Sequence, residues 1–151
     1  MNHPVPPAPL RRPFPAELLG ALKAAFGERV STAEAVRAHH GRDESPFDPQ
    51  LPDAVVFARN TEDVQNIVKL CGQYDVPIIP YGNGSSLEGH LLAVQGGVSI
   101  DLSEMNRVLS INAEDLTVTV EPGISRKQLN EALRDTGLFF PIDPGADASI
   151  G

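Results

Sequence analysis

The chain has 151 residues, about the length of one domain, and 41% of them are apolar, which is enough to bury an ordinary core. Twelve basic and twenty acidic side chains give a formal net charge of −8, which argues against nucleic acid or an anionic membrane as the main partner. The single cysteine excludes an internal disulfide, and no run of residues approaches the roughly 18 apolar positions that a transmembrane helix requires.

The first 13 residues are rich in proline and contain an Arg11-Arg12 pair, but they lack an apolar segment of signal-peptide length. We therefore expect residues 1–13 to form a flexible arm of a cytoplasmic protein. The single cysteine, Cys71, also fits a reducing compartment. A peripheral position at the inner membrane is left open.

Residues 14–51 predict a short helical lead followed by a charged connector that contains proline. Pro15 is suited to the start of a helix, apolar residues follow it at helical spacing, and Gly27 predicts its end. Ser31 and Glu34 have the spacing of a capping box, which predicts a second helix that ends near His40.

From residue 52 onward, strand and helix patterns alternate. Residues 54–58 predict a buried strand, and Asn60 or Thr61 predicts the cap of a helix with one apolar face. Residues 78–79 predict a second short strand, so the segment is expected to form a right-handed parallel unit. The apolar face of the predicted helix consists of Val64, Ile67, Val68 and Cys71.

The next stretch predicts three more strands. The first covers 97–102, and an antiparallel pair covers 107–111 and 116–120, with turn-forming residues between its two strands. The chain therefore has the pattern of an α+β fold, or an α/β-like one, in which a small mixed sheet with flanking helices follows the helical lead.

A last helix is predicted by the capping-box spacing of Ser125 and Gln128, and Gly137 predicts its end. The chain then finishes in a segment, 139–151, that is rich in glycine and other small residues. The buried face of the predicted helix consists of Leu129, Ala132 and Leu133.

The stretch 80–90, which we call the glycine loop, reads PYGNGSSLEGH and follows the predicted strand at 78–79. Its three glycines and two serines would allow backbone N–H groups to converge on an anion such as a phosphate. No lysine or arginine occurs from Val76 to Asn106, so we expect main-chain dipoles and serine hydroxyls to hold that phosphate. An ordinary tight turn is the alternative.

Two familiar phosphate motifs do not fit the glycine loop. A P-loop needs a Gly-Lys-Ser/Thr sequence, and the loop has no lysine. A dinucleotide fingerprint needs a third glycine where Leu87 stands. Two further bends, Pro122-Gly123 and Asp143-Pro144-Gly145, could each be a simple turn.

The histidines and acids give no catalytic or metal assignment. His39, His40 and His90 lack the spacing of a shared metal site, so each is expected to face solvent or to cap an element. Asp101 is expected to be structural rather than a ribose contact. For Glu88, Asp143 and Asp147, solvation at the surface is the expectation.

Taken together in this order and spacing, the three bends resemble the PCMH-type flavin-binding domain of the vanillyl-alcohol oxidase and p-cresol methylhydroxylase family. Residues 52–151 are similar to the first part of that domain. The resemblance implies that backbone amides hold FAD, and that the FAD is non-covalent because Ser85 stands where covalent members carry a histidine. The implied cofactor contacts are Tyr81, Gly82, Asn83, Gly84, Ser85, Ser86, Gly89, His90, Pro122, Gly123, Pro144, Gly145, Ser149 and Gly151.

A narrower resemblance involves HGRDES at 40–45, PDAVV at 52–56 and the glycine loop, which are similar to cytochrome-type D-lactate dehydrogenases and the glycolate oxidase flavoprotein subunit. This resemblance implies a dehydrogenase that passes hydride from a D-2-hydroxy acid to FAD and then electrons to a cytochrome or quinone. Members of that family are much longer than this chain, and their metal-binding histidines and general base lie beyond the matching part. The 151 residues alone are therefore expected to be inactive, to bind FAD poorly and to self-associate through exposed apolar area.

Three other functions remain open at this point. The chain could belong to a D-2-hydroxyglutarate or glycolate dehydrogenase of the same family. It could also be part of an NADPH-using reductase of the cell-wall precursor pathway, which the segment 40–45 disfavours. In the third alternative, it is a non-catalytic domain whose nest is empty or binds a simple anion.

Overall fold

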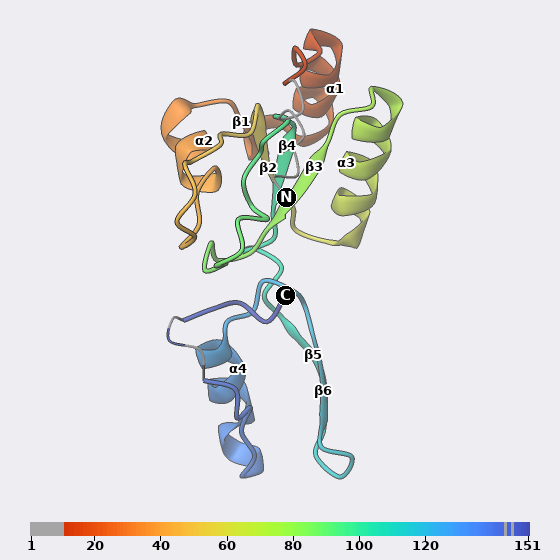
Figure 1. Ribbon diagram of the computed structural model, residues 1–151. Coiled ribbons are helices and arrows are strands. Elements are labelled where there is room, and N and C mark those ends of the chain that lie inside the picture. Colours follow the sequence, from red (N-terminus) through yellow and green to blue (C-terminus); the bar gives the residue numbers. More distant parts are fainter. Residues whose placement is uncertain (1–10, 144, 146) are drawn as a thin grey trace, which may run out of the picture.

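The computed structural model describes residues 11–143, 145 and 147–151. Figure 1 shows two lobes joined by a narrow junction, near which the chain also ends. We call residues 11–106 the sheet lobe and the remaining described residues the hairpin lobe. Most of the predicted N-terminal arm, residues 1–10, lies outside the described residues.

A four-stranded sheet with the order β1-β2-β4-β3 forms the centre of the sheet lobe. Strands β2, β4 and β3 are parallel, whereas β1 pairs with β2 in the antiparallel direction. The predicted parallel strands are therefore present, but β4 lies between β2 and β3. The strands are β1 (Val30–Ser31), β2 (Ala54–Phe57), β3 (Ile78–Tyr81) and β4 (Val98–Asp101).

The three parallel strands end at the same level. Phe57 of β2 and Tyr81 of β3 are both paired in register with Asp101 of β4. The glycine loop follows Tyr81, so it begins at the carboxyl edge of the sheet, where open parallel sheets bind ligands.

Three helices surround this sheet, namely α1 (Ala16–Phe26), α2 (Glu34–His40) and α3 (Thr61–Gln73). Helices α1 and α3 share one apolar core with the sheet, in which Leu22, Ile67 and Val98 are fully buried. Burying a large aliphatic side chain contributes about 1.5–3 kcal/mol to the free energy of unfolding. The helical lead is thus packed into the same core as the strands.

The ends of α1 and α3 follow from their flanking residues. Gly27, with a φ of 58°, follows the last residue of α1 and its N–H bonds to the Lys23 carbonyl. At the start of α3, the Asn60 side chain accepts a hydrogen bond of 2.8 Å from the Asp63 N–H. The predicted end of α1 and the predicted cap of α3 are both confirmed.

The predicted capping box at Ser31 and Glu34 is wrong. Ser31 lies in β1, where it pairs with Val55, and α2 begins after Ala33 without a side-chain cap. Because α2 starts at Glu34, Ala33 occupies the N-cap position, and the Ser31 hydroxyl accepts from the Ala33 N–H instead. The predicted end of α2 at His40 is confirmed.

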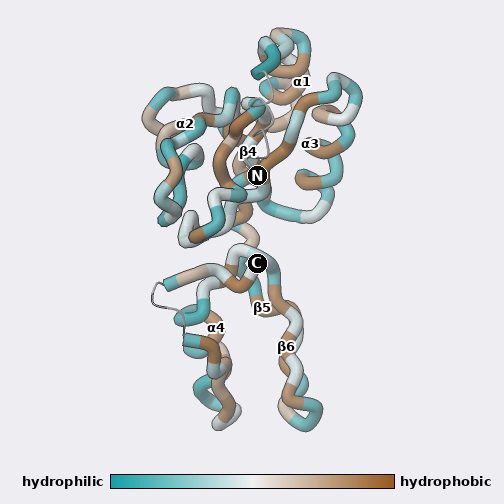
Figure 2. The backbone as a smooth tube through the Cα atoms, in the orientation of Figure 1, coloured by the Kyte–Doolittle hydropathy of each residue, from teal (hydrophilic) through white to brown (hydrophobic). Residues whose placement is uncertain are grey.

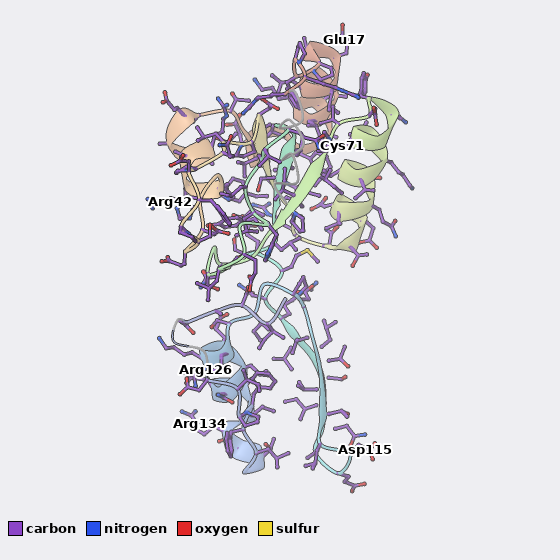
Figure 3. The ribbon with its side chains drawn as sticks, in the orientation of Figure 1. Glu17, Arg42, Cys71, Asp115, Arg126 and Arg134 are labelled. Carbon is purple, nitrogen blue, oxygen red and sulfur yellow. The ribbon has the colours of Figure 1, made fainter. Side chains whose placement is uncertain are left out.

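Cys71 lies in α3, is 1% exposed and belongs to the core between the helices and the sheet (Figure 3). Burial raises the pKa of its thiol to about 11. The predicted core position of Cys71 is therefore confirmed. On the same helix, however, Val68 is 43% exposed, so the buried stripe is narrower than predicted.

The hairpin lobe consists of β5 (Val108–Asn112), β6 (Thr117–Val120) and α4 (Arg126–Leu133). The two strands form a separate antiparallel sheet, as predicted. Ser125 and Gln128 form the predicted capping box of α4, and Gly137, with a φ of 74°, follows the short 3₁₀ turn after it.

The core of the hairpin lobe is small. Leu129 and Leu133 of α4 pack with Ile124 and with partly buried residues of the hairpin, but the predicted core residue Ala132 is exposed. Figure 2 shows that apolar residues also occur along the hairpin itself. Several of these residues face solvent in the hairpin lobe: Leu109, Ile111, Leu116, Phe139 and Ile142.

Arg11 and Arg12, at the start of the described residues, form ion pairs with Asp53 (2.5 Å) and Asp75 (2.6 Å). These pairs attach the beginning of the chain to the amino-terminal side of the sheet. None of the helices within the described part of the chain has the length and hydropathy of a membrane-spanning segment.

Candidate functional site

The glycine loop bends tightly where it leaves β3. Gly84 has a φ of 71°, and a Cβ atom there would lie 2.5 Å from the hydroxyl oxygen of Tyr81. A side chain at this position would therefore be both strained and in contact with the ring below it. Gly89 has a φ of 77°, but its close neighbour is the Phe47 ring, so its role is to pack the loop against the connector.

Five consecutive backbone N–H groups in the glycine loop, at residues 82–86, donate to no acceptor among the described residues. Four of these residues are partly buried and Asn83 is exposed, and a run of N–H groups in one bend without an acceptor among the described residues suits an external anion. The Ser85 and Ser86 hydroxyls add further donors in the same bend. This donor set suits the oxygens of a phosphate.

The glycine loop, the Pro122-Gly123 turn and the last residues of the chain, 147–151, come together at the junction between the lobes. The Asn83 side chain donates a hydrogen bond to the Asp147 carbonyl, and Gly82 lies against the Ser149 side chain. The Gly151 N–H in turn donates to the Pro122 carbonyl over 2.8 Å. Gly123 packs so closely on the Leu102 carbonyl that a Cβ atom there would overlap it.

Three open cavities meet at Asn83. The first, of about 200 Å³, is lined by residues 82–86 together with His90, Ser149 and Gly151. The second, of about 340 Å³, lies on the side of the hairpin lobe and has Ser103, Asn106, Ser125 and Lys127 in its wall. The third, of about 350 Å³, lies on the side of the lead and is lined by His39, Arg42, Asp43, Glu44, Tyr81, Asn83 and Gly84. The linked cavities offer room for an extended ligand whose phosphates lie on the glycine loop.

Gly145 of the third bend lines none of these three cavities. Gly145 is exposed and has open space around its Cα, and Pro144 lies outside the described residues. Residues 147–151 make the contacts of this bend instead, partly through the pairing of Ser149 with Ser125.

Two basic side chains that the sequence analysis missed lie beside the glycine loop. Arg42 comes from the segment after α2 (Figure 3), and Lys127 comes from α4, where its Nζ lies 3.4 Å from Asp147 Oδ2. Basic residues are therefore present at the site, although none occurs between residues 76 and 106 of the sequence. The two residues lie 41 or more positions from Asn83 in the sequence, so only the fold brings them to the loop.

Asp43 and Glu44 of the connector form hydrogen bonds with the glycine loop. The Glu44 N–H donates to the Ser86 carbonyl over 2.9 Å. Burial acts to raise the pKa of Asp43, but hydrogen bonds from Ser45, Ser86 and Gly89 lower it below its usual value. Asp43 therefore acts as an ionised acceptor that links the two segments.

His40 is not at the solvent surface or at a cap, so that prediction is wrong. Its ring is buried, with Nε2 at 2.8 Å from Asp101 Oδ2 and Nδ1 at 2.9 Å from the Val36 carbonyl. Burial acts to raise the pKa of Asp101, but the hydrogen bonds from His40 and Ser103 outweigh it and lower this pKa. Asp101 is buried and structural, as expected.

The other two histidines are exposed, as expected. His90 Nδ1 lies 3.0 Å from the Ser86 hydroxyl, so this side chain stands at the edge of the first cavity. His39 Nε2 lies 3.2 Å from the Tyr81 hydroxyl. Among the described residues, no three or more histidine, cysteine or acidic side chains form a group that could hold a metal ion.

A family model described as "FAD binding domain" matches residues 52–151. The chain is 54% identical, over 82% of its residues, to a protein of Danio rerio named probable mitochondrial D-lactate dehydrogenase. It is 48% identical, over 91% of its residues, to the mitochondrial D-lactate dehydrogenase [cytochrome] of Arabidopsis thaliana. These matches cover 25% and 24% of the two relatives, so the chain spans about a quarter of their length.

Two solved structures share the fold. Alkyldihydroxyacetonephosphate synthase matches with a TM-score of 0.82 and 28% identity, over 95% of this chain and 32% of the other. The 4-ethylphenol oxidase of Gulosibacter chungangensis matches with a TM-score of 0.70 and 31% identity, over 90% of this chain and 28% of the other. The arrangement of both lobes is thus found within larger proteins.

Proposed function

Because the chain belongs to the family of FAD-binding domains, we propose that it is the FAD-binding portion of a flavin-dependent D-2-hydroxy-acid dehydrogenase, with D-lactate as the substrate. The relatives named as D-lactate dehydrogenases, at 54% and 48% identity, support this choice of substrate. The name of the Arabidopsis relative supports a cytochrome as the electron acceptor. A cytoplasmic location is part of the proposal, although both relatives are named as mitochondrial.

The observation that carries the proposal is the run of five backbone donors at 82–86, which have no acceptor among the described residues. These N–H groups and the Ser85 and Ser86 hydroxyls would hold the diphosphate of FAD. Asn83, which lines all three cavities, would lie at the centre of the bound dinucleotide. FAD, when bound, would supply the redox chemistry of the proposed oxidation of the hydroxy acid.

The residues of this chain would bind and orient the cofactor rather than act on the substrate. Ser149, Gly151 and the Pro122-Gly123 turn would close the cavity on the side of the hairpin lobe. Ser85 offers a hydroxyl and no imidazole, so the FAD would be held without a covalent bond. Proton transfer from the substrate would need a base that we do not assign to any residue here.

Titration with FAD tests the site directly. We expect Gly84→Ala to weaken FAD binding at least about tenfold, because the new methyl group is strained at a positive φ and meets Tyr81. Gly20→Ala is the matched control, since a Cβ atom at Gly20 in α1 meets nothing within 4 Å. Equal FAD affinity for wild type and Gly84→Ala would contradict the proposed site.

Anaerobic reduction tests the substrate. In the longer protein that contains this chain, D-lactate should bleach the bound flavin. Bleaching by D-2-hydroxyglutarate or glycolate instead would assign a sister dehydrogenase, and bleaching by NADPH would assign the reductase. For the 151-residue chain alone we expect weak FAD binding, so tight stoichiometric binding would contradict that expectation. A chain that binds phosphate or sulfate but no FAD would support the non-catalytic alternative.

A further inference from the structure

The His40 ring covers the ends of all three parallel strands. It lies 4.2 Å from the Tyr81 ring of β3 and 5.8 Å from the Phe57 ring of β2, measured between ring centroids. Its Nε2 atom contacts Asp101 of β4 over 2.8 Å. His40 is 3% exposed and lies outside the residues matched by the family model, which begin at 52.

Both ring nitrogens of His40 face acceptors. The Val36 carbonyl can only accept, so the contact of 2.9 Å requires a proton on Nδ1. Nε2 then faces the Asp101 carboxylate, and a contact of 2.8 Å between these two acceptors requires one more proton between them. Because Asp101 Oδ1 also accepts from the Ser103 N–H over 2.8 Å, the carboxylate is favoured as the ionised partner. The geometry therefore describes a buried imidazolium paired with a carboxylate.

This pair fixes the lead against the glycine loop. His39, the neighbour of His40, contacts the Tyr81 hydroxyl over 3.2 Å, and Gly84 packs on that same hydroxyl. Arg42, two residues after His40, is one of the residues that line the cavity of about 350 Å³. Removing the pair would release both Tyr81, which supports the loop, and the segment that forms the opposite wall.

We infer that His40 is a positioning residue of the cofactor site: the proton it shares with Asp101 holds Tyr81 and the connector in place and thereby orders the glycine loop. The effect on FAD affinity rests on the proposed function, whereas the effect on the order of the loop does not. Removal of the His40 ring should therefore loosen the loop.

The titratable and charged groups that face the pair are few. They are His39 on α2, Tyr81 on β3 and Arg42 on the connector. Burial raises the pKa of Tyr81, so its phenol is neutral at neutral pH. His39 is exposed and contacts Tyr81 rather than Asp101.

The first test is nitrogen NMR of the histidine rings in the chain at neutral pH. We expect both ring nitrogens of His40 to carry protons, Nδ1 toward the Val36 carbonyl and Nε2 toward Asp101. A neutral His40 ring with a single N–H at neutral pH would overturn the inference. This readout needs no ligand.

The second test compares backbone order at 82–86, measured by ¹⁵N relaxation, in three variants. His40→Gln keeps a donor for Asp101, so the loop should stay ordered as in wild type. His40→Ala removes both ring contacts and should leave the loop mobile. Arg134→Gln, which removes an exposed charge at the far end of the hairpin lobe, is the control and should behave as wild type. A loop as ordered in His40→Ala as in wild type would overturn the inference, and if His40→Ala fails to fold, a mobile loop in His40→Gln would overturn it.

FAD affinity gives the third readout. His40→Ala should weaken binding about tenfold, while His40→Gln should bind as wild type does. If wild type binds no FAD, the proposed function is wrong. The protonation of the His40 ring and the backbone order at 82–86 still test the inference in that case. If wild type binds FAD and His40→Ala binds equally well at every pH, the inference is wrong and the proposed function stands.

Discussion

The two lobes differ in how far their sheets are buried. All four residues of β4 in the sheet lobe are buried, because strands lie on both sides of it and α1 and α3 cover one face. In β5 of the hairpin lobe, only Val108 is even partly buried. A two-stranded sheet has no central strand, so its faces and edges stay open unless something else covers them. Stability should therefore be concentrated in the sheet lobe.

The largest expected difference between the lobes concerns their cores. Leu22→Ala should lower the free energy of unfolding by about 3 kcal/mol, because Leu22 is fully buried between α1, α3 and the sheet. Leu129→Ala removes an equally buried leucine from the smaller core, so it should increase hydrogen exchange within the hairpin lobe and leave the sheet lobe protected. Exchange that rises equally in both lobes in Leu129→Ala would show that they unfold as one unit.

A second prediction concerns an ion pair within the sheet lobe. The Arg29 guanidinium, by hydrogen bonding, lowers the pKa of Asp63 at the start of α3. This lowered pKa stabilises the fold above the unfolded value of about 3.9, and the contribution is lost as pH falls through the lower folded value. Asp63→Asn should thus cost about 2 kcal/mol at pH 7 and less at pH 3, measured by urea unfolding. An identical cost at both pH values would contradict the role of the charge.

The start of α4 should show a smaller effect that stays within the hairpin lobe. Ser125→Ala removes the hydroxyl that accepts from the Gln128 N–H over 3.2 Å, and should cost about 1 kcal/mol of local stability. Ser110→Ala, on exposed β5, removes the same hydroxyl without a cap and should change stability by less than about 0.5 kcal/mol. Hydrogen exchange of α4 measures both variants, and equal effects would rule out the cap as the cause.

The smallest effect concerns the tip of the hairpin. Leu116 is 74% exposed and has a φ of 54°, which favours asparagine over leucine. Leu116→Asn should raise stability by less than about 1 kcal/mol and reduce self-association in sedimentation experiments. Leu109→Asn removes a similar exposed side chain from β5 without a change in backbone strain, so it should reduce self-association only. If neither variant reduces association, another surface is responsible.

The sequence predicted most elements because their signals are local. Apolar runs predicted β2 and β4, turn-forming residues predicted the hairpin, and caps such as Asn60 and Ser125 act within three residues. It missed β1 because two extended residues have no measurable period, and it misplaced His40 because its partner, Asp101, lies 61 positions away. Arg42 was missed as a site residue for the same reason. The roles assigned to the glycine loop and the two later bends remain predictions, although the fold brings the loop, the second bend and the end of the chain together.

The buried thiol of Cys71 offers a way to follow the opening of the larger core over time without any substitution. A thiol whose pKa is about 11 and whose sulfur is enclosed by α1, α3 and the sheet hardly reacts with alkylating reagents at neutral pH. Modification therefore has to wait until the surrounding helices separate. Since the chain has one cysteine, mass spectrometry of alkylated samples would count the molecules that have opened their larger core at each moment.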